Sequence, residues 1–66
     1  MTSNILKALQ RRYMAEIAEA DANIEVYLKH PAGVAEHPDM VSTIDTQIER
    51  IASAEDKLKA LDRYLK

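Results

Sequence analysis

Apolar residues recur at alternating steps of three and four on both sides of a segment that contains two prolines. In residues 3–29 they are Leu6, Leu9, Tyr13, Ile17, Ala20, Ile24 and Tyr27. In residues 38–65 they are Val41, Ile44, Ile48, Ile51, Ala54 or Glu55, Leu58, Leu61 and Leu65. This spacing is typical of a helix with one apolar face. The pattern therefore predicts two long amphipathic helices, 3–29 and 38–65.

The segment between the helices, residues 30–37, is predicted to be a joint that folds them back on each other. Pro31 lacks a backbone N–H and disfavours helical geometry in the residue before it. Gly33 is the only glycine in the chain and suits a chain reversal. Pro38 fits the first turn of a new helix. We expect Val34 to fold inward over the end of the hairpin.

Residues that favour helix starts support these boundaries. Thr2 or Ser3 is the expected N-cap of the first helix, because each side chain offers an oxygen to the unpaired N–H groups. Asp39 is expected in the first turn of the second helix, where the helix dipole favours a carboxylate. The predicted fold is therefore all-α: residues 1–66 form a single antiparallel two-helix hairpin.

The apolar residues also predict that the hairpin associates with a further copy. Two helices alone leave large apolar side chains half exposed, and small domains of this kind need a disulfide, a metal or a partner. The chain contains no cysteine. Met14, Val26 and Leu28 widen the first apolar stripe, as a multi-helix core requires. We expect a homodimer that forms a four-helix bundle, with a tetramer or a bundle with a different protein as alternatives.

Charge is unevenly distributed along the predicted hairpin, although the formal net charge is only −2. Basic residues gather at the open end, and acidic residues increase toward the joint. The basic residues are Lys7, Arg11, Arg12, Lys57, Lys59, Arg63 and Lys66. An antiparallel dimer would set each basic end beside an acidic one. A small nucleic-acid-associated protein that uses the basic end is an alternative, but the sequence lacks interleaved aromatic residues and a reading-helix motif.

Candidate ligand-binding residues are few. His30 and His37 lie near Glu36 and Asp39, and imidazole and carboxylate groups together can hold a divalent metal. However, the histidines lie on the joint, and no Glu-x-x-His pair is present. We therefore predict no metal site and assign these histidines to capping or loop packing, with a metal-binding bundle as an alternative.

The sequence predicts a protein that is not an enzyme and has no cofactor. It contains neither a glycine-rich phosphate loop nor a Gly-x-Ser-x-Gly motif. Tyr13, Tyr27 and Tyr64 are expected to be packing residues. No apolar run is long enough for a membrane span or a signal peptide, so a cytoplasmic location is expected.

Residues 27–40, YLKHPAGVAEHPDM, and residues 44–48, IDTQI, resemble the central segment of short uncharacterised proteins from tailed phages of marine cyanobacteria. The spacing of Gly33 from Glu36, His37, Pro38 and Asp39 is the most distinctive part. The resemblance covers about half of the chain and implies a viral accessory or structural protein in a bacterial host. It transfers no functional residue. Together, these features predict a non-enzymatic, self-associating interaction or structural module.

Overall fold

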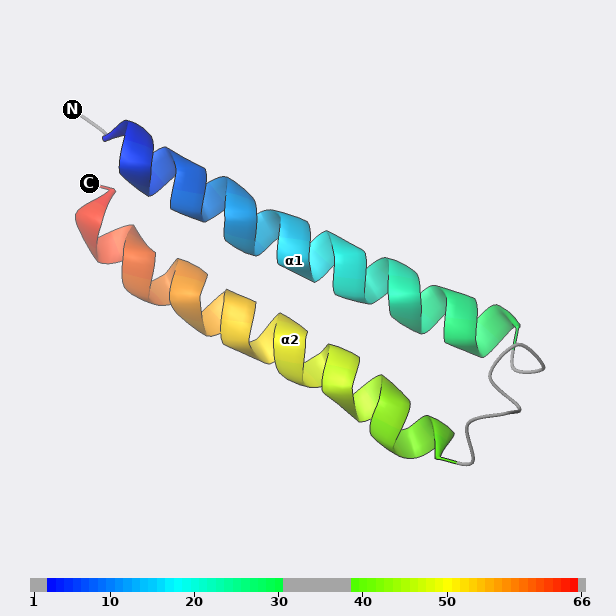
Figure 1. Ribbon diagram of the computed structural model, residues 1–66. Helices are drawn as coiled ribbons and strands as arrows, with labels where there is room; N and C mark the ends of the chain where they lie inside the picture. Colours follow the sequence, from blue (N-terminus) through cyan, green and yellow to red (C-terminus); the bar gives the residue numbers. More distant parts are fainter. Residues whose placement is uncertain (1–2, 31–38, 66) are drawn as a thin grey trace.

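The computed structural model describes residues 3–30 and 39–65, and these residues form an antiparallel pair of helices (Figure 1). Helix α1 spans Asn4–Lys29 and helix α2 spans Met40–Leu61, followed by a short 3-10 helix, η2, at Asp62–Tyr64. The pair forms a rod of 49 × 14 × 13 Å. The predicted all-α hairpin is confirmed for this part of the chain. The predictions made for Gly33, Val34 and Pro38 concern positions outside the described residues.

Helix α1 ends at the predicted residue and begins at Asn4, one residue after the predicted start. Ser3 is the N-cap: its side-chain oxygen accepts a hydrogen bond from the Ile5 N–H at 3.0 Å. The last helical residue is Lys29, and the His30 N–H donates to the Val26 carbonyl at 2.9 Å. The helix stops there because Pro31 disfavours helical geometry at His30.

Helix α2 is shorter than predicted at both ends. It starts at Met40 and not at residue 38, because Asp39 is its N-cap and has non-helical φ and ψ angles of −123° and 78°. From this position the Asp39 carboxylate accepts a hydrogen bond from the Ser42 N–H at 2.9 Å. The α-helix stops at Leu61, where the chain tightens into η2, so the predicted end at residue 65 is also corrected.

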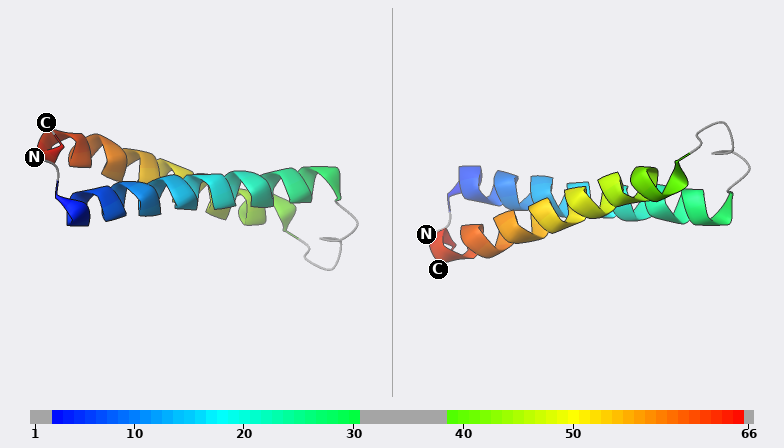
Figure 2. Two further views of the ribbon diagram at one scale, coloured as in Figure 1. Left: turned by 90° about the horizontal axis from the view of Figure 1, so that it is seen from above. Right: turned by 90° about the horizontal axis from the view of Figure 1, so that it is seen from below.

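The two helices meet along positions that repeat every seven residues, which we call the seam. The seam positions are Leu6, Tyr13, Ala20 and Tyr27 in α1, and Met40, Gln47, Ala54 and Leu61 in α2. Ala20 and Ala54 are fully buried, and Leu61 and Gln47 are 7% and 9% exposed. A strict seven-residue repeat produces the slow left-handed winding of a coiled coil. Figure 2 shows the corresponding shallow crossing of the helices.

The apolar stripe predicted for α1 is confirmed, since each of its members is buried or half-buried. The stripe predicted for α2 is wrong at two positions: Val41 is 82% exposed and Ile48 is 50% exposed. Met40 and Gln47, one residue earlier in each case, lie at the seam instead. One residue corresponds to about 100° around a helix, so Val41 and Ile48 point to the side of the hairpin.

The hairpin buries little of its apolar surface. None of the described large side chains is fully buried. Met14, Val26 and Leu28, which widen the first stripe, are all more than half exposed. The radius of gyration is 15.1 Å, whereas a compact chain of this length would have about 11 Å. Within residues 3–30 and 39–65, neither helix carries a stretch long and apolar enough to cross a membrane.

Candidate protein-interaction surface

The seam divides the surface of the hairpin into two faces of different chemistry. In both helices, residues three positions after a seam residue turn to one side, and residues four positions after it turn to the other. Three contacts between the helices identify matching sides. Lys57 lies over the Tyr13 ring, Asn23 bonds Gln47, and Arg50 bonds Glu19. Equal offsets in α1 and α2 therefore lie on the same face.

The polar face is held together by a small hydrogen-bonded cluster that the sequence reasoning missed. The side-chain oxygen of Gln47 accepts a bond from the Asn23 amide and another from the Arg50 guanidinium, both at 3.1 Å. Arg50 also pairs with Glu19 at 3.0 Å. The Glu19 side chain is 67% exposed, so this ion pair is a modest contribution to stability. Its position beside the buried Gln47 is the more informative feature.

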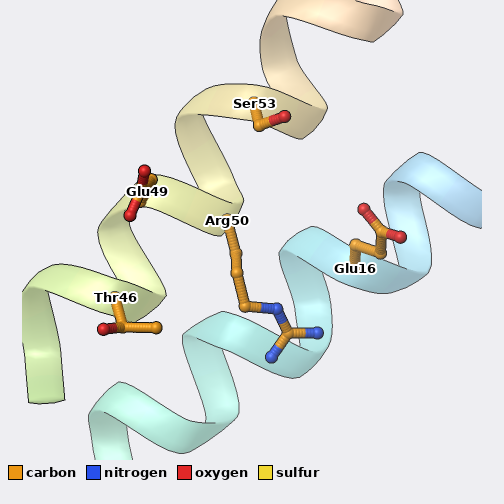
Figure 3. A pocket seen from close by; sticks show the side chains of 5 residues that line it. All are labelled: Glu16, Thr46, Glu49, Arg50 and Ser53. Carbon is orange, nitrogen blue, oxygen red and sulfur yellow. The ribbon is translucent and has the colours of Figure 1, made fainter.

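A shallow depression of about 360 Å³ lies on the polar face (Figure 3). It is lined by Glu16, Thr46, Glu49, Arg50 and Ser53. The Arg50 side chain reaches from α2 across to α1 (Figure 3), where it donates to Glu19, and it also donates to Gln47 of its own helix. The Thr46 hydroxyl in this lining donates to the Ser42 carbonyl at 3.0 Å, so it is not paired with a carboxylate that could activate it.

The opposite face, which we call the apolar face, carries large aliphatic side chains from both helices. Its half-buried inner row lies four residues after the seam positions: Ile17, Ile24, Ile44, Ile51, Leu58 and Leu65. Its outer members lie one residue after the seam positions and are more exposed: Met14 56%, Leu28 63%, Val41 82% and Ile48 50%. Val41 and Ile48, misplaced by the sequence reading, therefore belong to a coherent second surface.

Neither face is uniform. Five polar or charged residues fall on the apolar face, because they lie one or four residues after seam positions. Most of them are toward the open end of the rod: Lys7, Gln10, Asp21, Glu55 and Asp62. The polar face includes Leu9 and the exposed Ile5 and Val26. Tyr13 and Tyr27 are half-buried at the seam, as predicted. Tyr64 is 67% exposed, so its predicted packing role is wrong.

The antiparallel pairing gives the rod two ends of opposite charge. The open half, residues 4–16 and 53–65, carries six basic and four acidic side chains. The closed half, residues 17–30 and 39–52, carries two basic and six acidic side chains. The open half is thus net positive by two, and the closed half is net negative by four. Acidic residues interleave with the basic ones at the open end, which weakens any attraction for phosphate.

The joint residues considered as metal ligands are only partly described. His30 is exposed at the end of α1, and Asp39 is engaged in capping α2; Glu36 and His37 lie outside the described residues. Hydrogen bonds from the Ser42 backbone N–H, and then from its hydroxyl, lower the pKa of Asp39 below 3.8. In the part of the chain that the structure describes, no three His, Asp or Glu side chains are grouped so that they could hold a metal ion.

The surface that stands out is therefore the apolar face, and its chemistry has to be judged from the chain itself. Comparison with protein-family models, with curated proteins and with solved structures gives no match.

Proposed function

We propose that this protein is a non-enzymatic association module in which two hairpins join through their apolar faces to form a four-helix bundle. The observation that carries the proposal is the segregation of the surface: aliphatic side chains of both helices share one face, and the hydrogen-bonded polar cluster occupies the other. Large exposed aliphatic side chains that gather on one face are typical of a surface that binds a partner.

The geometry of the inner row supports this assembly. The seam positions and the inner row together form a repeat of three- and four-residue steps, which is the core pattern of a helix in a four-helix bundle. The core would include the seam alanines and the six aliphatic residues of the inner row, with Gln10 and Gln47 as polar members. The outer members Met14, Leu28, Val41 and Ile48 would then flank the contact between the two hairpins.

The exposed area also favours a partner. The hairpin exposes 5253 Å², whereas a compact folded chain of its mass, 7.5 kDa, would expose about 4,200 Å². Pairing the apolar faces of two copies would remove much of this excess. A second copy fits best, because two identical apolar faces match each other in width and length.

We further propose, from the resemblance of residues 27–40 and 44–48, that the module acts as a phage accessory or structural protein in a bacterial cytoplasm. In this setting the bundle would act by binding another protein or by building a small assembly. Affinity capture with the tagged wild-type protein from infected and from uninfected cells tests this part of the proposal: we expect a partner that is recovered only from infected cells, and recovery of the same proteins from both would contradict it.

Sedimentation equilibrium of the wild-type protein and of Ile48→Glu tests the dimer. Ile48 is half exposed in the hairpin, so its contribution to the dimer is about 1 kcal/mol for each copy. A glutamate there also introduces two charges into the contact, while glutamate remains a good helix former. We expect the wild-type protein to be dimeric at micromolar concentration and Ile48→Glu to raise the dissociation constant at least about 30-fold.

Ala15→Glu is the matched control, because it adds the same charge on the exposed back of α1. It should leave the dissociation constant within about twofold. A wild-type protein that is monomeric and fully helical at these concentrations would refute the dimer, as would equal weakening by both substitutions.

A further inference from the structure

We infer that the second copy docks with its joint at the opposite end of the bundle, and that two rows of charge beside the apolar faces set this orientation. The inference rests on the proposed dimer. Each row lies next to the outer members of the apolar face, five residues after the seam positions, where side chains of adjacent hairpins reach each other at the surface of a bundle.

The two rows have the same internal design. In α1 the row runs Arg11, Ala18, Glu25, and in α2 it runs Asp45, Ala52, Lys59. All six residues are exposed. Each row therefore has a small residue near the middle of the rod, with opposite charges seven residues to either side. A row of this kind is complementary to an antiparallel copy of itself.

Two symmetric dimers can bring the apolar faces of two hairpins together, and they differ in the direction of the two-fold axis. A two-fold axis across the middle of the rods sets α1 along α1 of the second copy, and α2 along α2, with the joints at opposite ends. Arg11 then faces Glu25, and Asp45 faces Lys59, on both sides of the axis. Four attractive pairs result, and each positive half lies beside a negative half.

A two-fold axis parallel to the rods sets α1 along α2 of the second copy, with the joints at the same end. The register within the hairpin, in which Tyr13 is opposite Lys57 and Asn23 is opposite Gln47, carries over to this contact. Arg11 then faces Lys59, and Glu25 faces Asp45. These four pairs are repulsive, and the two halves with net charge −4 lie together.

The dimer with both joints at the same end has one attractive contact that partly offsets this repulsion. Lys7 of each copy would face Asp62 of the other copy. This contact does not reverse the preference, because the closed halves still bring Asp21, Glu25 and Asp45 of both copies together. The net charge of −4 in that half already counts its two basic side chains, Lys29, which pairs with Glu25, and Arg50, which pairs with Glu19 on the polar face. The balance of charge therefore favours joints at opposite ends.

The substitution Arg11→Glu separates the two arrangements by the sign of its effect. With the joints at opposite ends, the introduced carboxylate would face Glu25 twice, and the dissociation constant should rise about tenfold at low ionic strength. With the joints at the same end, it would face Lys59 and the dissociation constant should fall. The increase in the dissociation constant should be smaller at high salt, because the charge pairs between the hairpins are exposed to solvent. The double variant Arg11→Glu with Glu25→Arg should restore wild-type affinity.

Arg12→Glu is the matched control, since the neighbouring residue makes the same change of charge on the polar side of α1. Its dissociation constant should stay within about twofold of wild type. A fall for Arg11→Glu, no change, or equal shifts for both variants would overturn the orientation while leaving the dimer intact. A monomeric wild-type protein would instead remove the proposed function itself, so the two failures are distinguishable.

Discussion

At the scale of single residues, the described polar side chains serve to start, fix and pair the helices. Ser3 and Asp39 cap the two N-termini, and Gln47 joins Asn23 to Arg50 at the seam. Asp39 is the clearest case, because its carboxylate accepts the Ser42 N–H and the Ser42 hydroxyl, and Thr43 bonds its carbonyl through both its N–H and its hydroxyl. One residue thus organises the first turn of α2.

The Asp39 cap should make stability depend on acid pH. Its pKa is lowered in the folded chain, first by the Ser42 backbone hydrogen bond. Its contribution is therefore complete above the ordinary value of 3.8 and is lost as the pH falls through the lowered pKa. Asp39→Asn keeps a capping oxygen but cannot ionise. Thermal unfolding should show wild type more stable than Asp39→Asn at neutral pH, with the difference absent near pH 2.

A difference that persists unchanged at acid pH would show that the charge of Asp39 does not contribute through its cap. Because both proteins contain the same remaining carboxylates, the effect of their titration on stability cancels when the two proteins are compared at the same pH.

At the scale of the helices, the contact between α1 and α2 depends on small seam residues. Ala20 and Ala54 are the two residues with no exposed surface among those described, and they lie near the middle of the rods. Side chains of this size let the helices approach closely. Larger neighbours such as Tyr13 and Leu61 then cover the seam toward its open end.

A larger side chain at Ala54 should force the helices apart. We expect Ala54→Leu to lower the free energy of unfolding by about 1–3 kcal/mol, the usual cost of overpacking. Ala60→Leu, at an exposed position of the same helix, should change it by less than about 0.5 kcal/mol. Urea unfolding followed by circular dichroism measures both, and an equal or greater stability of Ala54→Leu would show that the seam is not closely packed.

The helices and the hairpin could be predicted from the sequence because α1 has a single apolar stripe, and proline and glycine separate the two repeats. The phase of α2 could not be predicted in full. Val41 and Ile48 are more apolar than Met40 and Gln47, so hydropathy alone favours them for the seam. The choice depends on α1, where Asn23 offers Gln47 a partner, and a pattern along one helix contains no such information.

The candidate surface was foreseen only in outline. The number of apolar side chains leads to the expectation of a partner, and this expectation stays a prediction. The location of the surface could not be predicted. The spacing of the apolar residues places Val41 and Ile48 between the helices, and with these two residues there, α2 has no second apolar face. A search for residues seven apart, with Ala54 and Leu61 as anchors, would have found Gln47 and hence the face.

At the scale of the whole molecule, the two described helices share only a small core. Within residues 3–30 and 39–65 the buried residues are two alanines, one leucine and one glutamine, which is less than an independent domain of this length normally buries. On the proposed assembly, most of the apolar contact that stabilises the fold would form between hairpins. Folding and association would then be one process.

Coupled folding and association should make the unfolding temperature depend on protein concentration. Each tenfold increase changes the free energy by about 1.4 kcal/mol, so the midpoint should rise by about 3–6 °C. Circular dichroism melts over a hundredfold range of concentration measure this directly. A midpoint independent of concentration would show that a single hairpin is stable without a second copy.

The polar cluster has a consequence for how the helices slide past each other. Because the seam repeats every seven residues, moving α2 by one repeat would again set seam positions against seam positions, so the repeat alone does not fix the register. The residues seven away from Glu19 are Arg12 and Val26. A slip in one direction would set Arg50 against Arg12, and a slip in the other would set it against Val26. The Glu19–Arg50 pair therefore disfavours hairpins slipped by one repeat, in addition to its modest direct contribution to stability.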